Sequence, residues 1–158
     1  MDQFLIFGAA YLFLVIIAVG AVAFFFSRFK KKLLLLAAVS LPLSYILAKI
    51  LGYFVISPRP AFADHVMPLI SVASDNGFPS DHTLLSMTIA LIVFAYHKKI
   101  GALLIFLATV VGVCRVLVHA HHWIDVVGSV GISIAAVGGV YFIQQLYEKR
   151  THLTRHKR

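Results

Sequence analysis

Long stretches with almost no charge alternate with short polar segments along this chain. The apolar stretches cover residues 4–26, 33–56, 83–96, 100–118 and 126–146. A helix that crosses the hydrocarbon core of a bilayer needs about 20 apolar residues, and only the third stretch falls clearly short of that length. The pattern therefore predicts an all-α, polytopic membrane helix bundle with about five transmembrane helices.

The composition supports a membrane protein with a single domain. Apolar residues make up 61% of the 158 residues and charged residues only 13%, whereas about a quarter of a soluble domain is charged. The first apolar stretch has no basic start and is too long for the core of a signal peptide, so we expect it to be a spanning helix. We expect residues 1–158 to form one integral-membrane domain, and the single cysteine, Cys114, excludes an intramolecular disulfide.

The basic residues indicate which ends of the helices face the cytoplasm. Eleven of the 14 lysines and arginines lie in three segments, 28–32, 98–99 and 149–158. With five spans these segments share one side, and loops rich in lysine and arginine face the cytoplasm. We therefore expect the amino terminus outside and the carboxyl tail in the cytoplasm. The net charge of +8 then favours contact with anionic lipid headgroups over binding to nucleic acid.

The three remaining cations lie at or near the outer ends of the predicted helices. They are Lys49, Arg59 and Arg115. Charges at membrane depth are costly and usually functional, although a lysine near a helix end can also extend to the interface without any such role. Three cations at one end of the bundle indicate an anionic substrate group.

The outer segment 57–81 is rich in proline and acidic residues and leads into the third helix with the letters FPSDH. Ser80 or Asp81 suits the N-cap position, and His82 would lie in the first helical turn. A helix start presents unpaired N–H groups and the positive end of the helix dipole, which suit a phosphate. The simpler interpretation is helix capping without a ligand.

A second polar segment, CRVLVHAHHWID, joins the fourth and fifth apolar stretches at residues 114–125. His121 and Asp125 are four residues apart, so they are neighbours on one helical face. A carboxylate that fixes one imidazole nitrogen as a donor leaves the other nitrogen free as a base or nucleophile. A structural role is the alternative, in which Arg115 neutralises Asp125 and the histidines cap helix ends.

Three motifs that follow one another along the chain resemble, in the same order, those of the type 2 phosphatidic acid phosphatase superfamily, the membrane lipid phosphatases. The third motif matches in full, with Arg115, five residues, His121, three residues and Asp125. The second motif is PSDH, before the third helix, and the first, KILGYFVISPRP, runs from Lys49 through Arg59. The resemblance implies the helical core of that family and an activity on lipid phosphates.

The motif region, 49–125, covers about half of the chain and departs from the family's pattern at three points. Nine residues separate Lys49 from Arg59, where the common pattern has six. Asp81 stands where many members have glycine, and Cys114 replaces the usual serine.

The resemblance implies a phosphohistidine mechanism. His121, oriented by Asp125, would attack the terminal phosphorus, and His82 would protonate the leaving oxygen and later activate water. The phosphate oxygens would be held by Lys49, Arg59, Ser80, Arg115 and the backbone N–H groups near His82, including that of Asp81. No cluster of acidic residues in the sequence resembles a two-metal site, so we expect neither a metal nor a cofactor.

The PSDH form resembles the small bacterial branch that acts as undecaprenyl pyrophosphate phosphatase, the bacitracin-resistance type. It implies hydrolysis of undecaprenyl pyrophosphate to undecaprenyl phosphate at the outer face of the bacterial plasma membrane, which recycles a carrier for cell-wall synthesis. A phosphatidylglycerophosphate or phosphatidate phosphatase of the same superfamily is the alternative enzyme. The sequence leaves the oligomeric state open.

Two interpretations without catalysis are also open. A small membrane transporter or metal-handling protein would use a set of histidines without clear ligand spacing: His65, His119, His121 and His122. A regulatory or structural membrane protein would need none of the motif residues. His119 and His122 have no assigned role in the enzyme interpretation.

Overall fold

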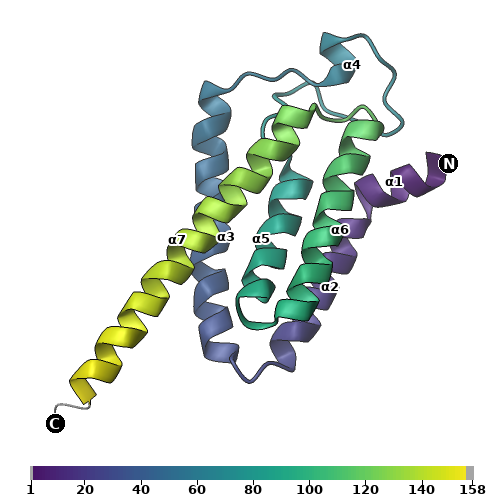
Figure 1. Ribbon diagram of the computed structural model, residues 1–158. Helices are drawn as coiled ribbons and strands as arrows, with labels where there is room; N and C mark the ends of the chain where they lie inside the picture. Colours follow the sequence, from purple (N-terminus) through teal and green to yellow (C-terminus); the bar gives the residue numbers. More distant parts are fainter. Residues whose placement is uncertain (1, 156–158) are drawn as a thin grey trace.

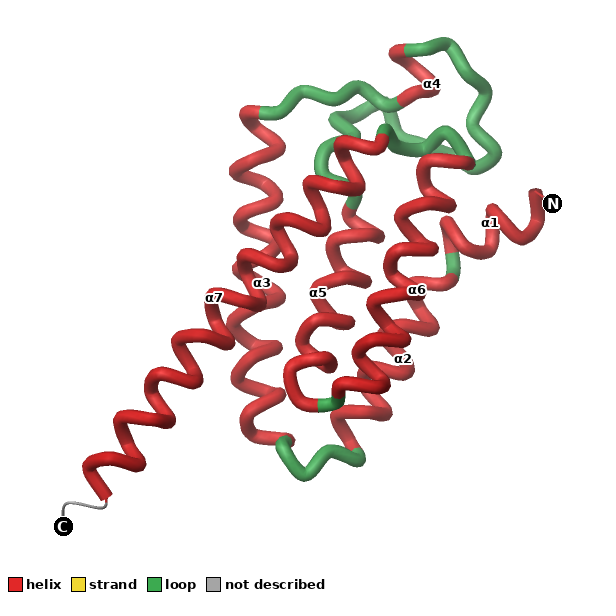
Figure 2. The backbone as a smooth tube through the Cα atoms, in the orientation of Figure 1, coloured by secondary structure: helices red, strands yellow, loops and turns green. Residues whose placement is uncertain are grey.

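The computed structural model describes residues 2–155. Within that range every regular secondary-structure element is a helix (Figures 1 and 2). The all-α prediction is confirmed for these residues. The helices are α1 (Asp2–Ala10), α2 (Leu12–Phe25), α3 (Lys30–Phe54), α4 (Pro60–Ala63), α5 (Asp81–Tyr96), α6 (Lys98–Leu117) and α7 (Trp123–Arg155).

Three of the helices described here, α3, α6 and α7, are each long and apolar enough to cross a membrane. The pair α1 and α2 adds a fourth crossing if its two halves are counted as one bent span. The fifth predicted span corresponds to α5, an apolar helix of 16 residues that is shorter than the others. The chain is thus a helical membrane protein, and the number of five crossings stays a prediction.

The sequence predicts one spanning helix for the first apolar stretch. The structure has two helices there, α1 and α2, with a bend of 47° between them at Tyr11. The bend lets α1 pack closely on α6: a Cβ added to Gly8 would lie 2.5 Å from Sγ of Cys114. It also frees carbonyl groups at the end of α1, and Nη1 of Arg115 donates to the carbonyl of Ala9 at 3.5 Å. Tertiary contacts with α6 therefore stabilise a break that hydropathy does not reveal.

Helix α5 lies at the centre of the bundle and packs against α2, α3, α6 and α7 (Figure 1). The largest core cluster joins buried apolar side chains of α2, α5 and α6, including Ile16, Met87 and Leu104. The end of α3, the starts of α5 and α7 and the end of α6 meet at one end of the bundle, together with α4 (Figure 1). This arrangement brings the two polar segments of the sequence to one place.

Buried hydroxyl groups fix the position of α7 against α5. Oγ of Ser129 lies 2.9 Å from the carbonyl oxygen of Ser80 and 2.8 Å from that of Asp125. One turn further along α7, Oγ of Ser133 accepts a hydrogen bond from Thr88 at 3.0 Å. Small polar residues of this kind stabilise close helix packing in membranes, and they keep the start of α7 in register with the start of α5.

Candidate active site

His121 lies at the centre of a buried polar cluster in the short connection between α6 and α7. Its side chain is 2% exposed, and Nδ1 lies 3.3 Å from Oδ2 of Asp125. Asp125 is in the first turn of α7 and is fully buried, and its Oδ2 also accepts a hydrogen bond from the backbone N–H of His122 at 2.9 Å. The predicted pairing of His121 with Asp125 is therefore present in the fold.

Two guanidinium groups face the other nitrogen of the His121 ring. Nη2 of Arg115 and Nη1 of Arg59 each lie 3.1 Å from Nε2. Because guanidinium nitrogens only donate hydrogen bonds, the network assigns the lone pair to Nε2 and the proton to Nδ1, facing Asp125. The nitrogen that can act as a nucleophile is thus the one that the cations surround.

The end of α6 sets the relative position of Arg115 and His121. The carbonyl of Arg115 accepts hydrogen bonds from the N–H groups of Ala120, at 3.0 Å, and His121, at 3.2 Å. The chain makes this turn through His119, whose φ of 59° lies in the left-handed region that usually favours glycine. His119 is exposed, so its backbone conformation explains its place in the turn.

Arg59 reaches the cluster from the loop between α3 and α4, where it precedes the first residue of α4. Its Nε donates to Oδ1 of Asp75 at 2.7 Å, and Nη1 donates to the carbonyl of Ala120 at 3.2 Å. Arg59 thus connects the long outer segment to the α6–α7 connection that carries His121.

The segment 75–77 holds this loop in place. Asn76 forms an isolated antiparallel bridge with Pro58, and its Oδ1 accepts from the N–H of Ser57 at 2.8 Å. Nδ2 of Asn76 lies 2.8 Å from the carbonyl oxygens of Gly52 and of Val55, at the end of α3. Asn76 therefore satisfies backbone groups that the helix end leaves unpaired.

Gly77 occupies a position where a side chain has no room. A Cβ there would lie 2.9 Å from Oδ2 of Asp125 and 2.9 Å from the carbonyl oxygen of Ser57. Asp75, Asn76 and Gly77 are parts of the site that the sequence pattern does not predict. The local sequence signal is a run of turn-forming residues at 74–77. The pairing of this run with residues 57–59 follows no short sequence spacing that would predict it.

Two of the three predicted residues at the start of α5, His82 and Ser80, lie near the cluster but differ in their contacts. His82 is half-buried, stacks edge-on against Phe13 with the ring centroids 4.7 Å apart, and lies within electrostatic reach of Arg115 and His121. Ser80 is the N-cap residue of α5 and is fully buried, but its hydroxyl accepts a hydrogen bond from Thr83 at 3.1 Å instead of capping the helix.

Lys49 and Asp81 are both exposed. They line a cavity of about 330 Å³ that Arg59 and Asp75 also line. Nζ of Lys49 lies 5.0 Å from the centroid of the Tyr45 ring. Among the described side chains, neither residue forms a hydrogen bond or ion pair with the His121 cluster.

The surroundings of the site shift the pKa values of two of its groups. Burial lowers the pKa of His121 below its ordinary value, and Arg115 and Arg59 act in the same direction against the opposing hydrogen bond with Asp125. The hydrogen bond from Arg59 lowers the pKa of Asp75. At neutral pH the ring of His121 is therefore neutral and Asp75 is ionised.

The histidines do not gather around a common point. Nε2 of His122 lies 3.1 Å from the carbonyl oxygen of Pro58 and 3.9 Å from Oδ2 of Asp64, while His65 is exposed in the outer loop. Within the part of the chain that the structure describes, no three His, Cys, Asp or Glu side chains are grouped as metal ligands would be.

Comparison with known proteins identifies the family. The chain matches the PAP2 superfamily over residues 8–149. It is 34% identical over 146 residues to the bacitracin transport permease protein BcrC of Bacillus licheniformis, covering 84% of this chain and 72% of that protein. It is 37% identical over 92 residues to the undecaprenyl-diphosphatase BcrC of Bacillus subtilis, covering 58% of this chain and 46% of that protein.

Solved structures agree with this family. LpxE of Aquifex aeolicus matches with a TM-score of 0.70 and 26% identity, over 88% of this chain and 84% of that one. A PAP2-type phosphatidylglycerolphosphate phosphatase from Bacillus subtilis shares the fold, with a TM-score of 0.57 and 23% identity over 94% of this chain and 77% of that one. The helical fold, the resemblance carried by the motifs and the family match agree: the chain belongs to the PAP2 superfamily and is a membrane phosphatase of that type.

Proposed function

We propose that this protein hydrolyses the terminal phosphate of undecaprenyl diphosphate to give undecaprenyl phosphate. The observation that carries the proposal is the lone-pair nitrogen of His121, which faces Arg59 and Arg115 while Asp125 holds the other ring nitrogen. A phosphate bound by the two guanidinium groups would bring its phosphorus next to Nε2. The proposal is supported by the relative from Bacillus subtilis, which is named as an undecaprenyl-diphosphatase.

In the first step, the Nε2 lone pair of His121 attacks the terminal phosphorus. The P–N bond forms as the bond from phosphorus to the bridging oxygen breaks, and the electron pair of that bond leaves with undecaprenyl phosphate. His82 donates a proton to this oxygen. Arg59 and Arg115 stabilise the charge on the transferred group, because phosphoryl transfer depends chiefly on positioning and electrostatic stabilisation.

In the second step, water replaces His121 on phosphorus. His82 accepts a proton from the water as its oxygen attacks, the P–N bond breaks, and inorganic phosphate leaves. Asp125 supports both steps because it stabilises the proton on Nδ1 while Nε2 carries the phosphoryl group. Ser80 and the N–H groups at the start of α5 donate to the phosphate oxygens.

Lys49 has a separate place in this proposal. Its exposed side chain is long and lines the cavity that also contains Arg59 and Asp81. We assign the Lys49 ammonium group to the outer oxygens of the bound diphosphate, where a compact point charge is sufficient.

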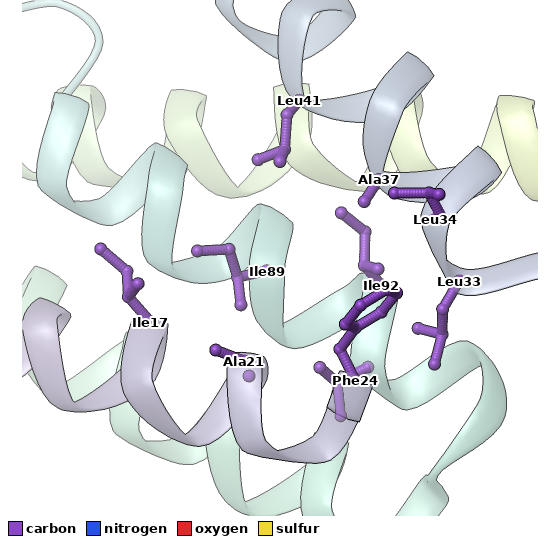
Figure 3. Close-up of a pocket in the computed structure, with 11 residues that line it drawn as sticks. Ile17, Ala21, Phe24, Leu33, Leu34, Ala37, Leu41, Ile89 and Ile92 are labelled. Carbon is purple, nitrogen blue, oxygen red and sulfur yellow. The ribbon is translucent and has the colours of Figure 1, made fainter. Parts of the chain in front are cut away.

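Adjoining cavities offer space for a substrate with a charged head and a long apolar chain. Asp81 lines both the cavity beside Lys49 and Arg59 and a second cavity of about 370 Å³. Leu41 lines both this second cavity and an apolar cavity of about 250 Å³. Figure 3 shows the apolar cavity, lined by side chains of α2, α3 and α5 such as Ile17, Phe24 and Ile92. A prenyl chain alongside these helices would leave the diphosphate at the polar end.

We further propose five crossings, made by α1–α2 together and by α3, α5, α6 and α7, with the His121 end outside the bacterial plasma membrane. The basic segments 28–32 and 98–99 lie at the end of the bundle opposite His121 (Figure 1). Helix α7 starts near His121 and runs toward that same basic end (Figure 1). Basic loops favour the cytoplasmic side, which supports an amino terminus outside and a carboxyl tail inside.

Phosphate release by the purified protein tests the substrate. We expect the highest kcat/KM with undecaprenyl diphosphate, lower values with phosphatidate and phosphatidylglycerophosphate, and no effect of EDTA. The glycerolipid phosphatase is the second candidate, since a solved structure with the same fold is a phosphatidylglycerolphosphate phosphatase. A preference for either glycerolipid would favour that candidate over ours, and loss of activity in EDTA would contradict a reaction that needs no metal.

The substitution His121→Ala distinguishes an enzyme from a transporter. The transporter is an alternative because the relative from Bacillus licheniformis is named a transport permease. We expect phosphate release to fall to the background while the protein still folds, as judged by its thermal unfolding in detergent. Release at the wild-type rate would remove His121 from the reaction. Arg115→Ala and His82→Ala, measured separately, extend the test to the other motif residues.

A further inference from the structure

Asp75 and His121 contact different nitrogens of one guanidinium group. Oδ1 of Asp75 accepts from Nε of Arg59 at 2.7 Å, whereas Nη1 of Arg59 lies 3.1 Å from Nε2 of His121 and 3.2 Å from the carbonyl oxygen of Ala120. None of the three sequence motifs includes Asp75.

These contacts fix the plane of the Arg59 guanidinium. With Nε and Nη1 both engaged, the group cannot rotate without losing hydrogen bonds. Nη2 of Arg59 forms no hydrogen bond with any described residue, so both of its hydrogens are available to an anion. The Arg59 side chain is only 11% exposed, so few other orientations are open to it.

The backbone around Asp75 is itself held in place. Asn76 bridges to Pro58 and bonds to the end of α3, and the N–H of Gly77 donates to the carbonyl of Ser57 at 2.8 Å. Residues 75–77 therefore lie alongside residues 57–59, which places the carboxylate of Asp75 next to Arg59.

We propose that Asp75 is a positioning residue, which holds the Arg59 guanidinium in the orientation that binds the phosphate of the substrate. The proposal rests on the proposed function of the site. A simple view of charge predicts the opposite effect, because a carboxylate near a bound phosphate repels it. The two views therefore differ in the sign of the effect when Asp75 is removed.

Kinetics of Asp75→Ala decide between the two signs. We expect kcat/KM for undecaprenyl diphosphate to fall about 10- to 100-fold, the loss that a small misplacement of a catalytic group produces. Asp75→Asn keeps an acceptor oxygen for Nε and should lose less. An unchanged or increased kcat/KM in Asp75→Ala would overturn the proposal.

A double-mutant cycle separates positioning from a general loss of structure. Because Asp75 acts through Arg59, Asp75→Ala should cause no further loss of kcat/KM in an Arg59→Ala background. A full additional loss there would overturn the proposal. Asp64→Ala is the matched control, since Asp64 is an exposed acid of the same outer segment whose carboxylate faces His122 and forms no hydrogen bond or ion pair with Arg59, and it should keep wild-type kcat/KM.

Binding of orthovanadate, followed by the shift in thermal unfolding, makes the result independent of the lipid substrate. We expect weaker vanadate binding in Asp75→Ala than in the wild type, with Asp75→Asn between them.

If the wild type binds vanadate but does not hydrolyse undecaprenyl diphosphate, the substrate assignment fails and the vanadate series still decides the role of Asp75. If Asp75→Ala does not fold, weaker binding in Asp75→Asn supports the role and equal or tighter binding overturns it. Absence of vanadate binding by the wild type would overturn both proposals.

Discussion

Nδ1 of His121 lies 3.3 Å from Oδ2 of Asp125, across the turn that begins α7. The carboxylate is fully buried, and the same oxygen is fixed by the N–H of His122. Asp125 is therefore well placed to select one tautomer of the imidazole, the one with its lone pair directed at Arg59 and Arg115.

The substitution Asp125→Asn should lower kcat strongly and leave KM nearly unchanged. An amide at this position can donate to Nδ1 and so favour the wrong tautomer, and in serine proteases the corresponding change costs about 10⁴ in kcat. We expect a loss of about 10³- to 10⁴-fold in steady-state phosphate release. A variant with wild-type kcat would show that Asp125 has only a structural role.

The pH dependence of kcat/KM should reflect the lowered pKa of His121. Burial moves this pKa below the ordinary value of 6.5, so the neutral, nucleophilic ring persists as the pH falls through 6.5. We expect the loss of activity caused by protonation of His121 to occur below that value. A profile measured in mixed buffers whose acid limb lies above 6.5 would contradict this assignment.

Gly77→Ala should disturb both stability and catalysis. The added methyl group would lie 2.9 Å from Oδ2 of Asp125, and overpacking of this kind costs about 1–3 kcal/mol of unfolding free energy. We expect a lower thermal midpoint and a lower kcat/KM. Gly131→Ala is the control, because a Cβ there has no neighbour within 4 Å, and it should keep the wild-type kcat/KM without lowering the thermal midpoint.

His119→Gly should stabilise the protein without affecting catalysis. His119 has a φ of 59°, which costs a residue with a Cβ about 1–2 kcal/mol and costs glycine little. We expect a higher thermal midpoint with unchanged kcat/KM. A large loss of activity would give the imidazole of His119 a part in the reaction that its exposed position does not indicate.

Hydropathy predicts the helices well because each apolar stretch has to be helical to satisfy its backbone in a bilayer. The predicted stretches at 33–56 and 100–118 correspond closely to α3 and α6, whereas 126–146 lies within α7, which begins at Trp123 and continues to Arg155. The bend at Tyr11 could not be predicted, since it depends on packing between α1 and α6 and the stretch around it is uniformly apolar.

Local spacing also explains which parts of the site could be predicted. His121 and Asp125 meet because they are four residues apart across the start of a helix, and Arg115 is joined to His121 by hydrogen bonds of the same turn. Asp75 reaches Arg59 through pairing of two loop segments 16 residues apart. Such pairing leaves no periodic signal in the sequence.

Trapping of the phosphoenzyme tests the role of His121 most directly. Undecaprenyl diphosphate labelled with ³²P in its terminal phosphate would be mixed with the purified protein, quenched in alkali within milliseconds and digested for mass spectrometry. The proposed reaction predicts an acid-labile, alkali-stable phosphoryl group on His121 that is absent from His121→Ala. Hydrolysis at the full rate with no label on His121 at any quench time, together with net inversion at phosphorus for a terminal phosphate made chiral by isotopic labelling, would contradict it.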